Sequence, residues 1–307
     1  MSKPTIAISV GDLNGVGIEI ALKAHKEISK LCSPLYCINK TLLSQSAKLL
    51  NTTIPQDFHL YEVAGDFEII PGKTDAQSGR YSYDSFMGAI TLCEQNKAQA
   101  VVTMPIHKEA WMMAGLHYKG HTDLLRKHFH KDAIMMLGCP EMFVALFSEH
   151  VPLKDVASLV KYKELKQFFL DLHNSIQKAQ IAVLGLNPHA GDNGVLGDEE
   201  TIITQAIQDV NKELGFEQFV GPIVPDVAFT PHFRANYNYF VAMYHDQGLA
   251  PLKALHFDES VNISLNLPIV RTSVDHGTAF DIAYKNKAKT LSYINAVKSA
   301  LEFIRNT

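Results

Sequence analysis

The stretch TIAISVGDLNGVGIEIAL, residues 5–22, decides the fold class. Residues 5–10 form a short run of apolar and β-favouring side chains, which is typical of a buried strand. Three glycines within 11–17 then predict a turn, and the apolar run at 18–22 indicates the start of a helix. A strand that leads through a glycine loop into a helix predicts an α/β domain.

The same alternation continues along the chain. Apolar positions at helical spacing occupy 81–98, and the β-rich run at 98–105 ends in a proline. We interpret the later apolar runs, at 142–148, 181–186, 226–230 and 239–244, as further strands. A helical pattern at 203–214 follows the acidic turn at 198–200. Strands separated by helices predict a mostly parallel sheet with helices on its faces.

Composition limits the class of protein. The 307 residues suggest two domains or one large α/β unit, and 47% hydrophobic and 20% charged residues indicate a globular chain. A formal net charge of -4 without a long Lys/Arg block argues against nucleic-acid binding. We expect a cytoplasmic protein that does not enter a membrane, because the sequence has no long apolar run and no basic, apolar leader. Four cysteines without a CxxC pair (Cys32, Cys37, Cys93 and Cys139) predict reduced, buried thiols.

Three of the apolar runs lead to a histidine. His150 follows the run at 142–148, His189 follows 181–186, and His245 follows 239–244. Ligands of open α/β sheets bind beyond the carboxyl ends of the strands, so these imidazoles could meet at one edge. Three histidines with an open position form a typical catalytic zinc centre. The alternative is that each histidine caps its strand through bonds to the backbone.

Two glycine-containing loops are candidates for nucleotide binding. The loop at 11–17 is neither a dinucleotide fingerprint nor a P-loop, and a tight strand-to-helix turn explains it equally well. The loop at 275–283 (DHGTAFDIA) places backbone amides, a hydroxyl and carboxylates before an apolar stretch with a helical pattern. It would suit a ribose and a phosphate at a helix N-terminus.

Anion-binding groups occur in two regions. Lys253, Asn262 and Arg271 lie in one polar–apolar region, and the stretch 120–123 (GHTD) opens a helical pattern with Thr122 in an N-cap position. A phosphate would gain from helix amides together with Arg or Lys. Taken one at a time, these groups are equally explained as surface charges or helix caps.

Six motifs occur in order along nearly the whole chain: 11–17 (GDLNGVG), 103–108 (TMPIHK), 120–123 (GHTD), 187–191 (NPHAG), 243–248 (MYHDQG) and 271–278 (RTSVDHGT). Together they resemble the family of 4-hydroxythreonine-4-phosphate dehydrogenases, NAD-dependent enzymes of pyridoxal phosphate (vitamin B6) synthesis. The last two motifs are the most diagnostic.

The resemblance implies an α/β isocitrate/isopropylmalate dehydrogenase-like fold, with two α/β/α domains, a mostly parallel sheet and an active site in a cleft. It places the first domain at residues 1–120 and 255–307 and the second at 121–254. It also implies a homodimer in which metal ligands come from both subunits.

The resemblance further assigns roles to individual residues. The implied metal ligands are His150, His189 and His245. The implied substrate contacts are His121, Thr122, Lys253, Asn262 and Arg271. The implied cofactor contacts are Asp275, His276, Gly277 and Thr278. We expect NAD, with NADP as the alternative, and a divalent cation, zinc first, with magnesium or cobalt as alternatives.

Some positions depart from the family pattern without touching an implied metal ligand. They are Leu13 and Ile18 in place of proline, His107 in place of asparagine, Asp123 and Asp192 in place of glutamate, and Asn266 in place of glycine. Asn266 matters most, because only glycine adopts a positive φ freely, so nearby cofactor contacts could differ.

The implied reaction oxidises the hydroxyl-bearing carbon of 4-phosphooxy-L-threonine, a phosphorylated hydroxy amino acid. Cation binding would lower the pKa of the hydroxyl. Lys253, Asp246 or a metal-bound water could take its proton. One alternative is a dehydrogenase of another phosphorylated hydroxy acid, such as a four-carbon sugar-acid phosphate. A second is a metal-dependent phosphohydrolase or phosphate-binding protein in which the loop at 275–283 is only structural.

Overall fold

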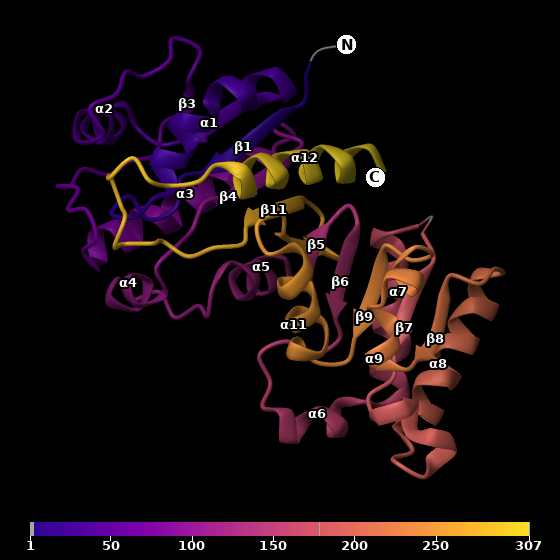
Figure 1. Cartoon of the computed structure of the whole chain (residues 1–307). Helices are drawn as coiled ribbons and strands as arrows, with labels where there is room; N and C mark the ends of the chain where they lie inside the picture. Colours follow the sequence, from indigo (N-terminus) through magenta and orange to yellow (C-terminus); the bar gives the residue numbers. More distant parts are fainter. Residues whose placement is uncertain (1–2, 178, 307) are drawn as a thin grey trace. The chain divides into compact units, whose positions relative to one another are not determined.

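The computed structural model describes residues 3–177 and 179–306, and the chain divides into two compact units (Figure 1). Unit 1 combines the chain up to Lys131 with Val261–Arg305, and unit 2 is Asp132–Ser260. We expected divisions at 120/121 and 254/255, whereas the chain divides at 131/132 and 260/261. The segment with His121 therefore belongs to the same unit as Arg271.

The sheet of unit 1 has the strand order β3-β2-β1-β4-β11-β10. Its strands are β1 (Thr5–Ser9), β2 (Ser33–Cys37), β3 (His59–Tyr61), β4 (Ala100–Thr103), β10 (Val261–Leu265) and β11 (Val270–Val274). All neighbouring pairs are parallel except β10 with β11, which are antiparallel. The last two strands come from the C-terminal part of the chain and continue the sheet beyond β4.

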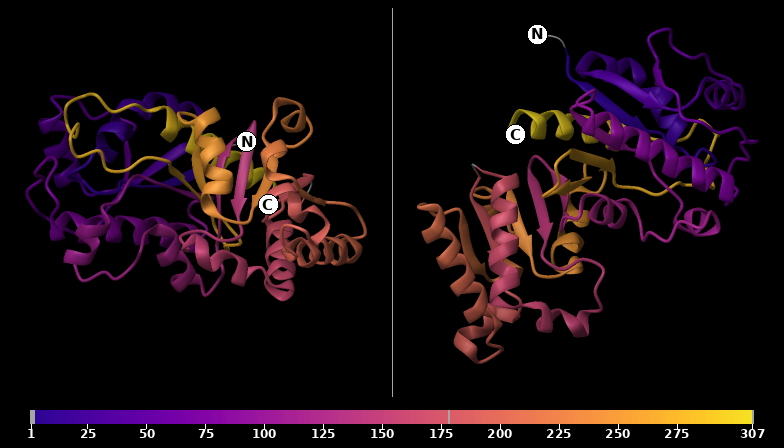
Figure 2. Two further views of the ribbon diagram at one scale, coloured as in Figure 1. Left: turned by 60° about the horizontal axis from the view of Figure 1, so that its bottom comes forward. Right: turned by 180° about the vertical axis from the view of Figure 1, so that it is seen from behind.

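Helices cover both faces of this sheet. They are α1 (Gly17–Leu31), α2 (Lys40–Leu49), α3 (Ala76–Glu94), α4 (Lys108–Met113), α5 (His121–Phe129) and α12 (Leu291–Asn306). The strand order changes direction at β1, and right-handed crossovers then place α1 and α3 on opposite faces (Figure 2). Helix α3 packs against β1, β2 and β4.

The predicted glycine turn is a place of close backbone approach. Gly11 has a φ of +70°, and a β-carbon there would lie 2.2 Å from the carbonyl oxygen of Pro105. The next amide, that of Asp12, donates to the same oxygen at 2.9 Å. Only glycine lets the exits of β1 and β4 lie this close.

The sheet of unit 2 has the order β5-β6-β9-β7-β8. Its strands are β5 (Ile134–Cys139), β6 (Met142–Leu146), β7 (Ile181–Leu184), β8 (Phe219–Ile223) and β9 (Tyr239–Ala242). Its helices are α6 (Leu153–Leu159), α7 (Tyr162–Ser175), α8 (Glu199–Leu214), α9 (Pro225–Ala228), α10 (Pro231–Arg234) and α11 (His245–His256), and a tight helical turn, η1, covers Pro188–Gly194. Only β5 with β6 is antiparallel. Helices α7 and α8 lie side by side (Figure 2).

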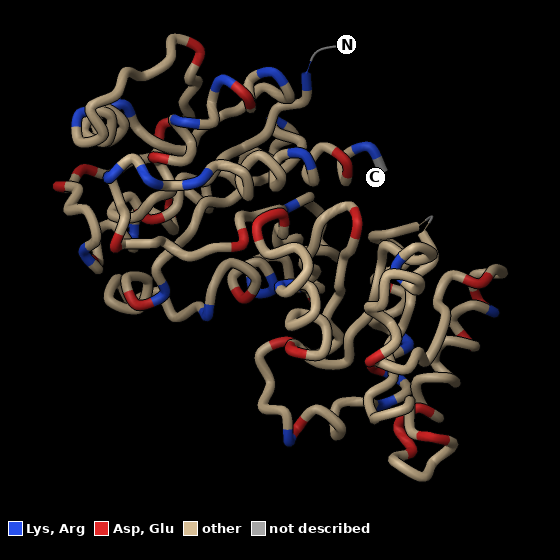
Figure 3. Tube along the Cα trace, in the orientation of Figure 1, with Lys and Arg blue, Asp and Glu red and all other residues tan. Residues whose placement is uncertain are grey.

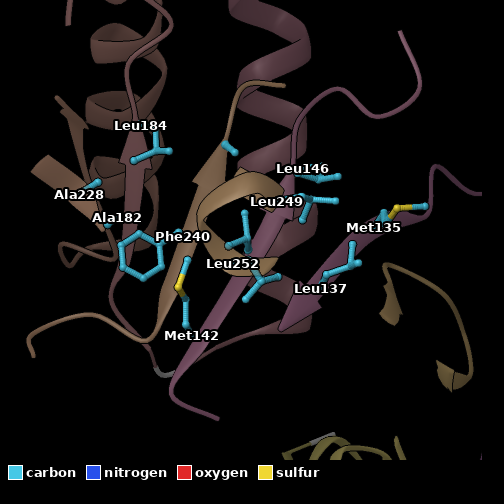
Figure 4. Close-up of a cluster of buried hydrophobic side chains, with 12 residues drawn as sticks. Met135, Leu137, Met142, Leu146, Ala182, Leu184, Ala228, Phe240, Leu249 and Leu252 are labelled. Atoms are coloured by element: carbon cyan, nitrogen blue, oxygen red, sulfur yellow. The ribbon is translucent and has the colours of Figure 1, made fainter. Parts of the chain in front are cut away.

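One face of this sheet packs against α11 through apolar side chains (Figure 4). Leu249 and Leu252 of the helix join Val144 of β6 and Phe240 of β9 in one cluster. A β-carbon on Gly248 would lie 2.4 Å from Cγ1 of Val144, so the helix can approach the sheet only because this residue is glycine. The cluster fixes the start of α11 relative to the strands.

The sequence predicted most of these elements. The expected strands at 5–10, 98–105, 142–148, 181–186 and 239–244 are confirmed as β1, β4, β6, β7 and β9. The expected strand at 226–230 is wrong, because Pro225 occupies the first turn of the short helix α9 and the strand lies earlier, at Phe219–Ile223. Proline has its φ fixed near the helical value, which favours a helix start over a strand.

The prediction of buried, reduced cysteines is confirmed. All four cysteines are buried and free, and burial raises their pKa values. Positive and negative side chains are interspersed over each unit (Figure 3). Within the described part of the chain, no helix is long and apolar enough to cross a membrane.

The contact at Gly11 yields a stability prediction. Gly11→Ala should lower the free energy of unfolding by about 3 kcal/mol, because it adds a steric clash to an unfavourable φ. Gly115→Ala is the matched control, since Gly115 has a φ of +76° and no atom near the added carbon. It should cost only about 1 kcal/mol. Urea denaturation measures both values, and equal losses would contradict the proposed clash.

Candidate functional site

The three predicted histidines lie beyond the carboxyl ends of adjacent strands in unit 2. Strands β6, β9 and β7 are neighbours in that order and are parallel, so their carboxyl ends meet at one edge. His150 follows β6, His245 is the first residue of α11 after β9, and His189 lies in η1 after β7. The topology therefore brings the loops that carry all three to the same edge of the sheet.

His150 and His245 are close to one another. Their ring centres are 5.6 Å apart, with the ring planes inclined by 40°. Ser148 holds the two strand exits together, because its amide and its hydroxyl donate to the carbonyl of Met243 at 3.2 and 2.6 Å. Two imidazoles bound to one tetrahedral zinc ion have ring centres roughly 5 Å apart. This pair therefore fits a shared divalent cation.

Asp246 orients the ring of His245. Oδ1 of Asp246 lies 2.6 Å from Nδ1 of His245. A histidine that ligates a metal through one ring nitrogen usually gives the other to a carboxylate, which fixes the ring and its tautomer. The contact leaves Nε2 of His245 as the nitrogen for a cation.

His189 lies exposed on a strained, anchored loop. His189, Ala190, Asp192 and Asn193 all have φ values between 43° and 56°, which costs non-glycine residues on the order of 1 kcal/mol or more each. Asn187 secures the loop, since its amide donates to Glu200 at 2.7 Å and its Nδ2 donates to Glu199 at 2.7 Å.

Within the part of the chain that the structure describes, no three His, Cys, Asp or Glu side chains are placed to hold a metal. The single chain thus pairs His150 with His245 and does not close the predicted group of three. The alternative, that these histidines cap their strands, has no support at His245, whose Nδ1 contacts a carboxylate.

Gln247 and Lys253 lie on the same helix as His245. Buried Gln247 accepts a bond from the amide of Met243 at 2.7 Å and donates to the carbonyl of Gly185 at 2.7 Å. It thus ties the exit of β9 to the exit of β7. Lys253, half-buried, places its ammonium 5.3 Å from the ring centre of Phe257.

Unit 1 contains a buried guanidinium that has no carboxylate partner among the described residues. Arg271 is 2% exposed and donates to Thr103 Oγ1 at 2.8 Å, to Ser264 Oγ at 3.1 Å and to Asn262 Oδ1 at 3.5 Å. Its Nε is buried without a partner. Burial lowers the pKa of Arg271 to about 9, which still leaves it charged at pH 7. A buried cation among neutral oxygens is a site prepared for an anion.

His121 and Thr122 lie in the first turn of α5. The N-cap position is held by Gly120, the residue before the helix, and no side chain of the described residues caps the helix there, so the expected N-cap role of Thr122 is wrong. The reason is that Thr122 is already inside the helix and is buried. The ring of His121 packs edge-on against Phe86, and its Nε2 is buried without a partner. Burial, and then the charges of Arg271 and Lys108, hold the pKa of His121 well below its ordinary value.

The predicted cofactor residues lie in a loop packed on the glycine turn. The carbonyl of Thr278 accepts the amide of Val16 at 3.0 Å, and the amide of Asp275 donates to Ser292 Oγ at 3.1 Å. His276 and Gly277 are exposed, and a β-carbon added to Gly277 would have no described atom within 4 Å. The exposed backbone at 276–277 is the part of this loop that a nucleotide could reach.

The helix expected after this loop is absent from the described residues, which form turns at 280–286. Ala279 and Tyr284 have φ values of 43° and 59°, and left-handed residues end a helix. That expectation is wrong, so no helix N-terminus contributes at this loop. Asn266 has a φ of 58°, which is the left-handed conformation that glycine adopts freely and that asparagine adopts more readily than most other residues.

Three residues were missed as parts of these sites. Thr103 ends β4 beside β11, and Ser264 on β10 pairs directly with Arg271 on β11. Gln247 was noticed only inside a motif. The signal available in the sequence was a polar residue in a mostly apolar strand at Thr103 and Ser264, and a polar residue at the start of α11 at Gln247. Their partners depend on strand pairing that the sequence does not reveal.

Comparison with known proteins is consistent with this geometry. A 4-hydroxythreonine-4-phosphate dehydrogenase of Sulfurimonas denitrificans is 73% identical over 98% of both chains. The solved 4-hydroxythreonine-4-phosphate dehydrogenase of Klebsiella pneumoniae is 30% identical, covers 99% of this chain and 100% of its own, and has a TM-score of 0.86.

A β-decarboxylating dehydrogenase of Thermococcus kodakarensis has the same fold, with 13% identity, coverage of 99% and 84%, and a TM-score of 0.51. The expected isocitrate/isopropylmalate dehydrogenase-like α/β fold is therefore confirmed. The model of the family described as pyridoxal phosphate biosynthetic protein PdxA matches residues 30–300. This chain belongs to that family.

Proposed function

We propose that this protein oxidises 4-phosphooxy-L-threonine with a nicotinamide cofactor to 2-amino-3-oxo-4-phosphooxybutanoate. The substrate loses a hydride from its hydroxyl-bearing carbon and a proton from its hydroxyl. The 3-oxo acid then loses carbon dioxide to give 3-amino-2-oxopropyl phosphate, because the ketone accepts the electron pair of the breaking bond. The observation that carries the proposal is the buried Arg271 without a counter-charge, in a chain 73% identical to a protein named for this activity.

The anionic substrate is held by cationic and neutral donors. In unit 1, Arg271 supplies a guanidinium fixed in direction by Thr103 and Ser264. The Asn262 amide and the backbone amides of the first turn of α5, with His121 and Thr122, supply further contacts. Lys253 in unit 2 is the remaining proposed substrate contact. Such fixed donors orient the reacting carbon, which contributes to the rate.

We propose that His150 and His245 bind a divalent cation through ring nitrogens. Zinc is the first choice, because nitrogen ligands suit it well, and magnesium or cobalt are alternatives. When bound, the cation supplies Lewis-acid stabilisation of the negative charge that develops on the substrate hydroxyl. His189 is the third ligand in this proposal, and a second copy of the chain supplies it in a homodimer. Its exposure on an anchored loop supports that role.

We propose that Asp275, His276, Gly277 and Thr278 bind the cofactor. The exposed stretch at 276–277 gives a ligand access to backbone groups. NAD is favoured over NADP, because the carboxylate of Asp275 suits a ribose hydroxyl and would repel a 2′-phosphate.

The hydroxyl proton requires a base. Asp246 is engaged with Nδ1 of His245, so its proposed role is to hold that ring. Lys253 is the proposed base, through its Nζ. Its half-buried position on α11 places it two turns after His245 on the same helix.

Removal of a metal ligand tests the cation site. His245→Ala and His150→Ala should each lose bound cation on dialysis and lower kcat by at least about 100-fold, because the developing charge loses its stabilisation. Asp246→Asn should cost about 10- to 100-fold. His232→Ala, which removes an exposed histidine of α10, is the control. Metal content, NADH formation and circular dichroism are the measurements. Full activity in a metal-free His245→Ala protein would refute the site.

Replacement of the buried guanidinium tests the anion site. Arg271→Met should lower kcat/KM for the phosphorylated substrate by about 100-fold or more, since charge-assisted bonds are lost. The same change should leave the free energy of unfolding unchanged or higher, because it removes a buried unpaired charge. Steady-state assays with saturating NAD and urea denaturation measure the two effects. A variant that is strongly destabilised but retains its kcat/KM would contradict the assignment.

A further inference from the structure

The start of α5 has a second cationic neighbour besides Arg271. Lys108 is exposed and begins α4, and its Cε lies 3.7 Å from the position of a β-carbon on Gly120. Gly120 is the residue from which α5 begins. The end of the Lys108 side chain therefore lies beside the N-cap residue of α5, and no side chain of the described residues caps the backbone amides of the turn that follows.

The acidic residue of that turn does not neutralise these charges. Asp123 accepts the backbone amide of Lys119 at 3.0 Å and pairs with Lys127 at 3.3 Å. Among the described residues, neither Lys108 nor Arg271 forms an ion pair with a carboxylate. Both are near enough to His121 to lower its pKa by their charge. The cluster is thus positive and lacks an internal counter-charge.

The geometry points to a phosphate as the group that this cluster receives. A substrate phosphate carries a charge of about −1.5 to −2 near neutral pH and has three acceptor oxygens, whereas a carboxylate carries only one charge. A single carboxylate would be matched by Arg271 alone. Free helix amides, a guanidinium and an ammonium together match a phosphate. The buried, unpartnered Nε of Arg271 and Nε2 of His121 show that the cluster has unused donor or acceptor capacity.

We propose that Lys108 is a further phosphate-binding residue, which contacts the substrate phosphate beside the first turn of α5. This inference rests on the proposed function and adds to it a specific contact outside the expected set of His121, Thr122, Lys253, Asn262 and Arg271. The ammonium of Lys108 acts as a mobile point charge, because Lys108 is exposed, whereas Arg271 is buried and fixed.

Substitution of Lys108 tests whether this lysine binds the substrate phosphate or is only a solvated surface charge. Lys108→Met should raise KM for the phosphorylated substrate about tenfold or more with little change in kcat, because binding to the phosphate is the same in the ground and transition states. Lys108→Arg should retain most of the affinity. Lys131→Met, which removes an exposed lysine beyond the other end of α5, should leave KM unchanged.

The second part of the experiment uses the unphosphorylated compound, 4-hydroxythreonine, as the substrate. Lys108→Met should not alter kcat/KM for this compound, since the group that Lys108 contacts is missing. An equal loss with both substrates would assign Lys108 to another part of the substrate and overturn the proposal. So would a KM for the phosphorylated substrate within twofold of that of the unmodified protein.

Calorimetry with inorganic phosphate keeps the test independent of turnover. Lys108→Met should weaken phosphate binding about tenfold, and Lys131→Met should not. If the unmodified protein forms no NADH from 4-phosphooxy-L-threonine, the proposed function fails, while the phosphate titration still decides the role of Lys108. Equal phosphate affinity in the Lys108→Met and unmodified proteins would overturn the inference even if the dehydrogenase activity is present.

Discussion

Parallel pairing of neighbouring strands is the constraint on which both candidate sites depend. In unit 2, strands β6, β9 and β7 are parallel, so their carboxyl ends lie at one edge of the sheet. His150 and His245 come together at that edge. In unit 1, β4 and β11 are parallel, so the end of β4 supplies Thr103 to Arg271. The antiparallel strand β10 completes this second site with Ser264. Each set of side chains is distant in sequence and is assembled by strand register.

The two sites use burial differently. The guanidinium of Arg271 is removed from water and has no negative partner among the described residues. Its burial therefore lowers the free energy of unfolding, and it favours the binding of an anionic ligand. The histidines lie at an accessible edge and are held by their second contacts, Asp246 for His245 and the anchored Asn187 loop for His189. A site with accessible ligating atoms and fixed supporting contacts is suited to bind and release its ligand repeatedly.

The sequence predicted the order of strands and helices well, because buried parallel strands are continuous apolar runs. It failed at 226–230, where Pro225 starts a helical turn, and at 280–286, where left-handed residues prevent a helix. Both failures concern backbone geometry set by one or two residues. The family motifs indicated the implied site residues, but the individual residue patterns did not distinguish ligands from caps.

The sequence could not reveal which residues contact one another across neighbouring strands. Thr103 and Ser264 are ordinary polar residues until strand pairing places them against Arg271. The closeness of His150 and His245 likewise follows from the pairing of β6 with β9. Lys108 lies in the motif at 103–108, but only the folded structure shows that its side chain lies beside the start of α5.

The split of unit 1 into two segments has a consequence for biosynthesis. Unit 2 is one continuous segment, so it can fold on the ribosome while translation is still in progress. Unit 1 lacks β10 and β11 until the whole of unit 2 has been translated. The nascent N-terminal segment must therefore wait with an open β4 edge, and Arg271 reaches Thr103 of β4 only after unit 2 has been synthesised.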